Sequence, residues 1–95
     1  MEQHTYSFPG TIPVSRRAHV GVVGSGDLEV LVEPADRGAT VDLRTSVDGY
    51  GETWHAVLER FFSRADIAAT VQINDFGATP GTVSLRLSQA VEAAE

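Results

Sequence analysis

Two stretches of the chain alternate between apolar and polar residues, the pattern of a β-strand with one buried face. Residues 28–33 read Leu-Glu-Val-Leu-Val-Glu and stop at Pro34, which has no amide hydrogen for a strand ladder. Residues 40–47 share one buried side, made by Val41, Leu43, Thr45 and Val47. Because only a few residues join the two strands, we expect them to pair as an antiparallel hairpin; a parallel return needs a longer crossover.

The next segment changes to a helical period and predicts a helix near residues 50–64. Its apolar positions are Trp54, Val57, Leu58, Phe61 and Phe62. The other side is polar, so we expect this stripe to cover the sheet rather than bind a cofactor. Residues 69–74 alternate again and predict a third strand, and the glycine- and proline-containing residues 75–81 predict a loop.

The two ends of the chain follow less regular patterns. Residues 82–94 fit either a strand or a helix, and we favour a strand that gives way to a short helix. Residues 18–23 predict a strand that turns back into residues 28–33, and residues 1–17 predict an extended N-terminal arm. The predicted fold class is therefore α+β, a small antiparallel sheet with one main helix packed on one face and a short C-terminal helix.

Length and charge narrow the classes of function. The chain has 95 residues, so we expect a single domain over residues 1–95. Its net charge of -6 opposes attraction to nucleic acid or to anionic membranes. No apolar run approaches the roughly 20 residues that cross a bilayer, and the first residues lack the features of a secretory signal. We expect a cytoplasmic protein without nucleic-acid or membrane partners.

The reactive side chains are few. The chain has no cysteine, which excludes disulfides, thiolate metal sites and a thiol of its own for carrying acyl groups. All seven basic residues are arginines, which excludes Schiff-base chemistry. His4, His19 and His55 lack the spacing of metal ligands, so we assign no metal site.

Ser25 is the candidate for chemistry, because it stands between Gly24 and Gly26 at the end of a predicted strand. A plain hairpin turn is the simplest interpretation. The glycine spacing fits neither a dinucleotide fingerprint nor a nucleophile elbow, and a triad with His19 and Asp27 would lack an oxyanion site. The remaining functional interpretation is attachment, in which another enzyme uses the Ser25 hydroxyl as the acceptor for a prosthetic group.

Two segments carry a family resemblance. Residues 22–31, Val-Val-Gly-Ser-Gly-Asp-Leu-Glu-Val-Leu, and residues 75–81, Asp-Phe-Gly-Ala-Thr-Pro-Gly, closely resemble the acyl carrier (delta) subunits of bacterial malonate decarboxylases. The likeness covers nearly the whole chain, and a more distant one links it to the acyl carrier subunit of citrate lyase. It implies that Ser25 bears a phosphoribosyl-dephospho-coenzyme A arm through a phosphodiester bond, with Gly24, Gly26 and Asp27 around the attachment point.

The resemblance also implies a carrier without catalytic residues of its own. The thiol of the arm would carry acetyl and malonyl thioesters between the acyltransferase (alpha) subunit and the decarboxylase (beta and gamma) subunits. A prosthetic-group transferase and a malonyl transferase are further implied partners. The alternative is a noncatalytic docking or assembly subunit in which Gly-Ser-Gly is only a turn.

The arm would have to reach more than one active site, so we expect partners to dock beside Gly24, Gly26 and Asp27. In this prediction Arg16 and Arg17 assist docking and the Trp54 face is turned away. Residues 75–81 are either a docking loop or a rigid turn.

Overall fold

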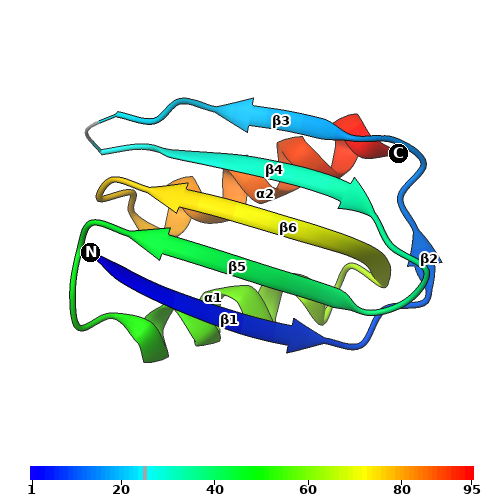
Figure 1. Cartoon of the computed structure of the whole chain (residues 1–95), viewed down its shortest axis with the longest axis horizontal. Coiled ribbons are helices and arrows are strands. Elements are labelled where there is room, and N and C mark those ends of the chain that lie inside the picture. The colour runs from blue at the N-terminus through cyan, green and yellow to red at the C-terminus, as the bar shows by residue number, and fades with distance from the viewer. Residues whose placement is uncertain (25) are drawn as a thin grey trace.

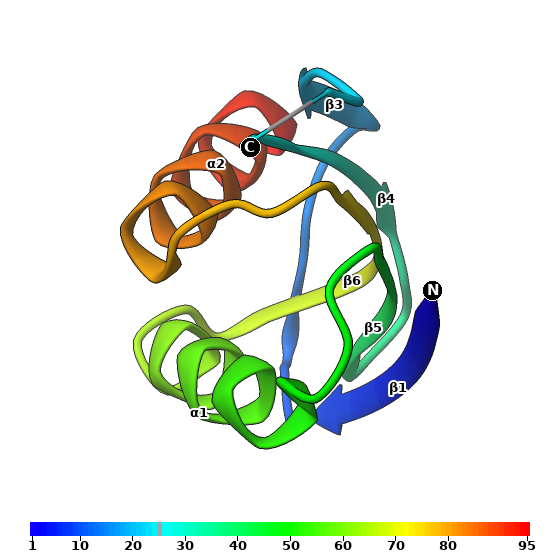
Figure 2. The same ribbon diagram turned by 90° about the vertical axis from the view of Figure 1, so that its left-hand side faces the viewer.

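The computed structural model describes residues 1–24 and 26–95, so the predicted attachment residue Ser25 lies outside the described residues. The elements are β1 (Glu2–Phe8), β2 (Ile12–Pro13), β3 (Ala18–Gly21), β4 (Leu28–Pro34), β5 (Ala39–Thr45), α1 (Gly51–Phe62), β6 (Ile67–Asp75) and α2 (Pro80–Ala94). Across the sheet the strands run in the order β1, β5, β6, β4, β3, and β2 pairs with β6. Both helices cover the same face of the sheet (Figures 1 and 2). The predicted α+β class is confirmed.

The predicted hairpin between residues 28–33 and 40–47 is wrong, because β6 lies between β4 and β5. β6 is antiparallel to β4, with Leu28 opposite Asp75, and parallel to β5. The sheet is therefore not antiparallel throughout, and α1 supplies the crossover that the parallel pair needs. The short connection from β4 to β5 passes the end of β6. Two strand spacings amount to about 10 Å, which a few residues can span, so a short connection does not require β4 and β5 to be neighbours.

The core lies between the sheet and the two helices. The predicted apolar stripe of α1 is confirmed as core, because Trp54, Leu58 and Phe62 are buried. Phe62 stacks on Phe8 of β1 with ring centroids 5.0 Å apart. The fully buried side chains of the sheet include Leu28, Val30, Val32, Val41, Leu43, Val71 and Ile73.

The C-terminal segment is one continuous helix, so the predicted strand within residues 82–94 is wrong. Thr79 caps α2 by accepting a hydrogen bond from the Thr82 amide at 3.2 Å, and Pro80 occupies the first turn, where its missing amide hydrogen costs nothing. The buried residues of α2 follow helical spacing. A strand would have buried Leu85 beside Val83 and Leu87, whereas Leu85 is 54% exposed.

The N-terminal segment is extended as predicted, but its first half belongs to the sheet instead of forming a free arm. β1 pairs antiparallel with β5 along its whole length, from Glu2 opposite Thr45 to Phe8 opposite Ala39. The hydroxyl of Tyr6 donates to the Gly51 carbonyl at 2.9 Å and ties β1 to the start of α1. Neither helix in the described part of the chain is long and apolar enough to span a membrane.

Candidate functional site

Two loops meet at one end of the sheet, the β3–β4 connection and the β6–α2 connection (Figure 1). The Gly26 amide donates to the Phe76 carbonyl at 2.7 Å, and the Phe76 amide donates to the Asp27 carbonyl at 3.0 Å. These bonds continue the β4–β6 ladder beyond its terminal pair, Leu28 at the start of β4 and Asp75 at the end of β6. The Asp27 amide also donates to the Gly24 carbonyl at 3.1 Å. The described residues on both sides of Ser25 are therefore tied to the frame of the sheet.

The space around this loop is open. A Cβ atom placed on Gly24 or on Gly26 would meet no atom within 4 Å. Gly26 has a φ of 74°, in the left-handed region that favours glycine. Gly24 needs no such conformation, so its contribution here is the absence of a side chain. Gly24 and Gly26 therefore leave open space where other residues would place side chains.

Asp27 is bound by an arginine that the sequence analysis missed. Arg86 of α2 donates from Nε to Oδ1 at 3.1 Å and from a terminal nitrogen to Oδ2 at 2.8 Å. The Leu28 amide donates to Oδ1 at 2.7 Å. The Arg86 hydrogen bond first, and the Leu28 amide second, lower the pKa of the Asp27 carboxyl. The pair anchors the loop to α2 and gives Asp27 a structural role.

The only signal in the sequence for Arg86 is that it is the sole basic residue after Arg64. Its partner lies far away in the chain, and the segment that contains it was predicted as a strand. The periodicity of the sequence therefore could not predict that Asp27 and Arg86 form a pair.

The loop after β6 is a rigid turn organised by Asp75, whose side chain is buried. Its carboxylate accepts hydrogen bonds from the Thr45 hydroxyl at 2.8 Å, from the Gly77 amide at 3.2 Å and from the Ala78 amide at 3.0 Å. All three partners are hydrogen-bond donors, so they match the acceptor oxygens of this side chain. This turn brings the Phe76 backbone against the β3–β4 loop. Residues 75–79 thus form an ordered turn, and whether partners also dock on it stays a prediction.

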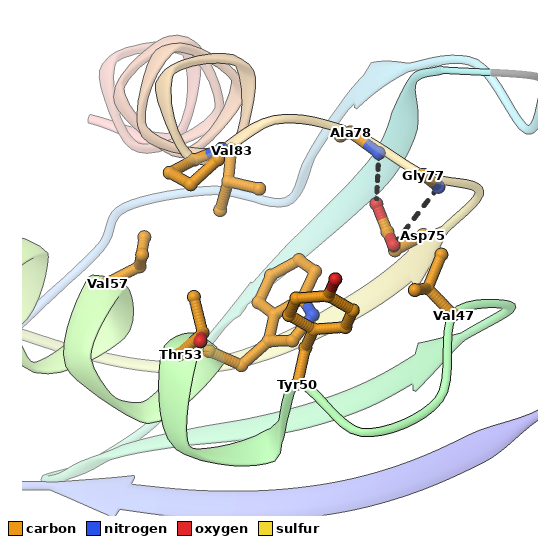
Figure 3. Close-up of a pocket in the computed structure, with 10 residues that line it drawn as sticks. Val47, Tyr50, Thr53, Val57, Asp75, Gly77, Ala78 and Val83 are labelled. Carbon is orange, nitrogen blue, oxygen red and sulfur yellow. Dashed lines mark hydrogen bonds between the residues drawn. The ribbon is translucent and has the colours of Figure 1, made fainter.

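A cavity of about 280 Å³ opens at the same end of the molecule, between α1 and the start of α2 (Figure 3). Its walls are mostly apolar and include Tyr50, Trp54, Val57, Ala78 and Val83. The expectation that the Trp54 face is turned away from docking partners stays a prediction, although Trp54 lines the same cavity as Gly77 of the β6–α2 loop. Trp54 stands at the end of the sheet where that loop lies, because α1 begins directly after β5 ends there.

Other candidate residues are not brought to the loop. The Arg16 amide donates to the Ala94 carbonyl at 3.1 Å, at the C-terminal end of α2. Arg17 lies 3.6 Å from Glu33, also at the opposite end of the sheet. Neither arginine is placed to assist docking at Gly24 and Gly26. His19 contacts Glu29 at 3.0 Å and does not form a dyad with Asp27, in line with the rejection of a serine triad.

Comparisons with known proteins agree with one another. A family model described as malonate decarboxylase delta subunit (MdcD) matches residues 15–94. The chain is 52% identical over 96 residues to the malonate decarboxylase acyl carrier protein of Pseudomonas paraeruginosa, covering 99% of this chain and 97% of the relative. It is 51% identical over 94 residues to the protein of the same name from Azotobacter vinelandii, covering 97% of this chain and 95% of the relative.

A solved structure is similar over the complete chain. The match is to one chain of the crystal structure of a Pseudomonas malonate decarboxylase hetero-tetramer in complex with malonate. The TM-score is 0.95 at 44% sequence identity, and the alignment covers 100% of both chains. Sequence and fold therefore point to the same group of proteins.

Proposed function

Because this chain belongs to the malonate decarboxylase delta-subunit family and is an acyl carrier protein of malonate decarboxylase, we propose that Ser25 is its attachment residue. In this proposal the hydroxyl of Ser25 is joined by a phosphodiester bond to a phosphoribosyl-dephospho-coenzyme A arm. The observation that supports it most directly is the open space at Gly24 and Gly26, on both sides of this residue.

The residues present fit such a group. An acyl carrier that forms thioesters needs a thiol, and the chain contains no cysteine. The bound arm would supply that thiol for acetyl and malonyl thioesters. The chain's own residues hold the attachment loop in place: Phe76 bonds it through the backbone, and Arg86 fixes Asp27 from α2.

The proposed partners are those of a malonate decarboxylase assembly. The similar crystal structure is of a hetero-tetramer, and we assign to this chain an acyltransferase (alpha) subunit and decarboxylase (beta and gamma) subunits as partners. A prosthetic-group transferase would load Ser25, and a malonyl transferase would deliver malonyl groups. Val22 and Val23, 62% and 54% exposed beside Gly24, offer apolar contact at the docking end.

The reactions themselves would take place on the partners. His19 and Asp27, the nearest candidates for acid-base chemistry, are engaged with Glu29 and Arg86. This chain therefore binds, orients and presents the acyl group, and we assign it no catalytic residue.

The test is the intact mass of the protein purified with its complex from its native host. We expect an added mass equal to the phosphoribosyl-dephospho-coenzyme A arm, located on the peptide that contains Ser25. A Ser25→Ala variant should lose the adduct, whereas Ser88→Ala, an exposed serine on α2, should keep it. An unmodified chain in an active complex would overturn the proposal and favour a docking or assembly subunit.

A further inference from the structure

The cavity between α1 and α2 is directly joined to the attachment loop. Gly77 lines the cavity, and a Cβ atom placed on it would lie 4.0 Å from the Gly26 amide nitrogen. The neighbouring Phe76 exchanges both of its backbone hydrogen bonds with Gly26 and Asp27. Gly26, the described residue that directly follows the proposed attachment residue, therefore lies beside the wall of this cavity.

The chemistry of the walls selects for an uncharged ligand. Trp54, Val57 and Val83 make the walls apolar, and none of the described residues that line the cavity is basic. Among the described residues, Asp75 is the one acidic side chain in the wall. Its oxygens already accept hydrogen bonds from the Thr45 hydroxyl and, as Figure 3 shows, from the Gly77 and Ala78 amides. A ligand carboxylate would find no cation there and would meet a like charge.

The size of the cavity limits the ligand further. At about 280 Å³ it lies just below the range for drug-sized ligand sites, which is about 300 to 1,000 Å³. This suits a short acyl thioester with the adjacent part of its arm and is too small for a long acyl chain.

We propose, resting on the proposed function, that this cavity binds the uncharged acetyl thioester of the chain's own arm and does not bind the malonyl form. The acetyl group has no charge, whereas the malonyl group ends in a carboxylate. The acetyl form is then shielded from water between reaction cycles. The malonyl form stays outside, where the decarboxylase subunits can take it.

The test uses the unmodified full chain, so that it does not depend on where the arm is attached. S-acetylpantetheine and S-malonylpantetheine are titrated separately at matched ionic strength while Trp54, the single tryptophan, is followed by fluorescence and by the NMR signal of its indole N–H. We expect the acetyl probe to shift both signals and to bind at least about tenfold more tightly than the malonyl probe. Equal binding of the two probes, or no shift with the acetyl probe at millimolar concentrations typical of a tethered group, would overturn the inference.

Three variants sharpen the result. Val57→Phe fills the cavity and should abolish acetyl binding, whereas Ala56→Phe adds the same ring to an exposed neighbouring position of α1 and should leave it unchanged. Thr53→Arg places a cation at the cavity wall and should raise malonyl binding until the preference is lost or reversed. Thermal unfolding of each variant checks that the fold is intact. Unchanged acetyl binding by folded Val57→Phe would contradict the proposed location.

The two proposals fail separately. Absence of an adduct on Ser25 in the mass measurement would remove the proposed function and leave a thioester-binding cavity. An adduct on Ser25 together with no binding of either probe would leave the carrier function and remove the cavity inference.

Discussion

Asp27 and Arg86 hold the β3–β4 loop, which carries the proposed attachment residue, through two charge-assisted hydrogen bonds between distant parts of the chain. Two bonds from the planar guanidinium to one carboxylate fix the relative orientation of the two groups as well as their distance. The pair orients the loop relative to α2. Asp27 is consequently not free to offer its charge to a partner.

This pair makes stability depend on pH in a predictable direction. The folded-state pKa of Asp27 is lowered, so its contribution is complete above its ordinary pKa of about 3.9 and is lost as the pH falls through the lower, folded value. We expect the free energy of unfolding of Asp27→Asn to fall less than that of the original protein as the pH drops below about 4. Urea unfolding of both proteins from pH 7 to 2.5 measures this, and parallel curves would contradict it.

Substitutions at Gly24 and Gly26 can separate the effect of added side-chain bulk from the effect of backbone strain. Valine at Gly26 must adopt a positive φ, at a cost of about 1 to 2 kcal/mol, whereas valine at Gly24 enters open space without that strain. We expect both variants to slow loading of Ser25 by the prosthetic-group transferase, but only Gly26→Val to lower the unfolding midpoint. Loading at the normal rate by Gly24→Val would show that the enzyme does not approach from this side.

At the scale of elements, α1 connects the core to the candidate site. It crosses over between the parallel strands β5 and β6 and places its first turn at the end of the sheet that carries the attachment loop. Its Trp54 is buried on one side by the core and borders the cavity on the other. Trp54 therefore both packs in the core and forms part of the cavity wall.

We expect Trp54→Ala to lower the free energy of unfolding by about 3 to 5 kcal/mol, the range for removing a large buried aromatic side chain. Tyr50→Ala, at an exposed residue just before the same helix, should change it far less. Chemical denaturation followed by circular dichroism measures both values, since the fluorescence reporter is removed. A change within error for Trp54→Ala would mean that its contacts add little to the core.

At the scale of the whole molecule, the two ends of the sheet differ. One end carries the attachment loop, the cavity and the exposed Val22 and Val23. The other end carries the C-terminal end of α2, Arg16 and the short strand β2. This polarity predicts that partner subunits contact the first end.

Val23→Asp should weaken assembly and reduce malonate turnover in the reconstituted complex several-fold, because it puts a charge into an apolar contact. Ile12→Asp is the matched control, since Ile12 is 62% exposed at the opposite end. Turnover and pull-down of the partner subunits should both respond to the first variant and not to the second. The reverse result would place the docking surface at the other end.

The local elements of this protein could be predicted from the sequence because each has a period that neighbouring residues repeat. Residues 40–47 and 69–74 alternate as strands do, and the stripe from Trp54 to Phe62 has helical spacing. The motif around Ser25 likewise lies in one contiguous stretch, so the family resemblance was visible there. For residues 82–94 the pattern fits both the period of a strand and that of a helix. Only packing against the sheet distinguishes the two, so the predicted strand there was wrong.

Only the tertiary structure decided which elements are neighbours. The insertion of β6 between β4 and β5 satisfies hydrogen bonds on both of its edges, and a short connecting loop does not reveal it. The Asp27–Arg86 pair and the cavity beside Gly77 also depend on residues far apart in the chain. Periodicity acts over a few residues, whereas strand order, ion pairs and cavities depend on packing free energy summed over the whole molecule.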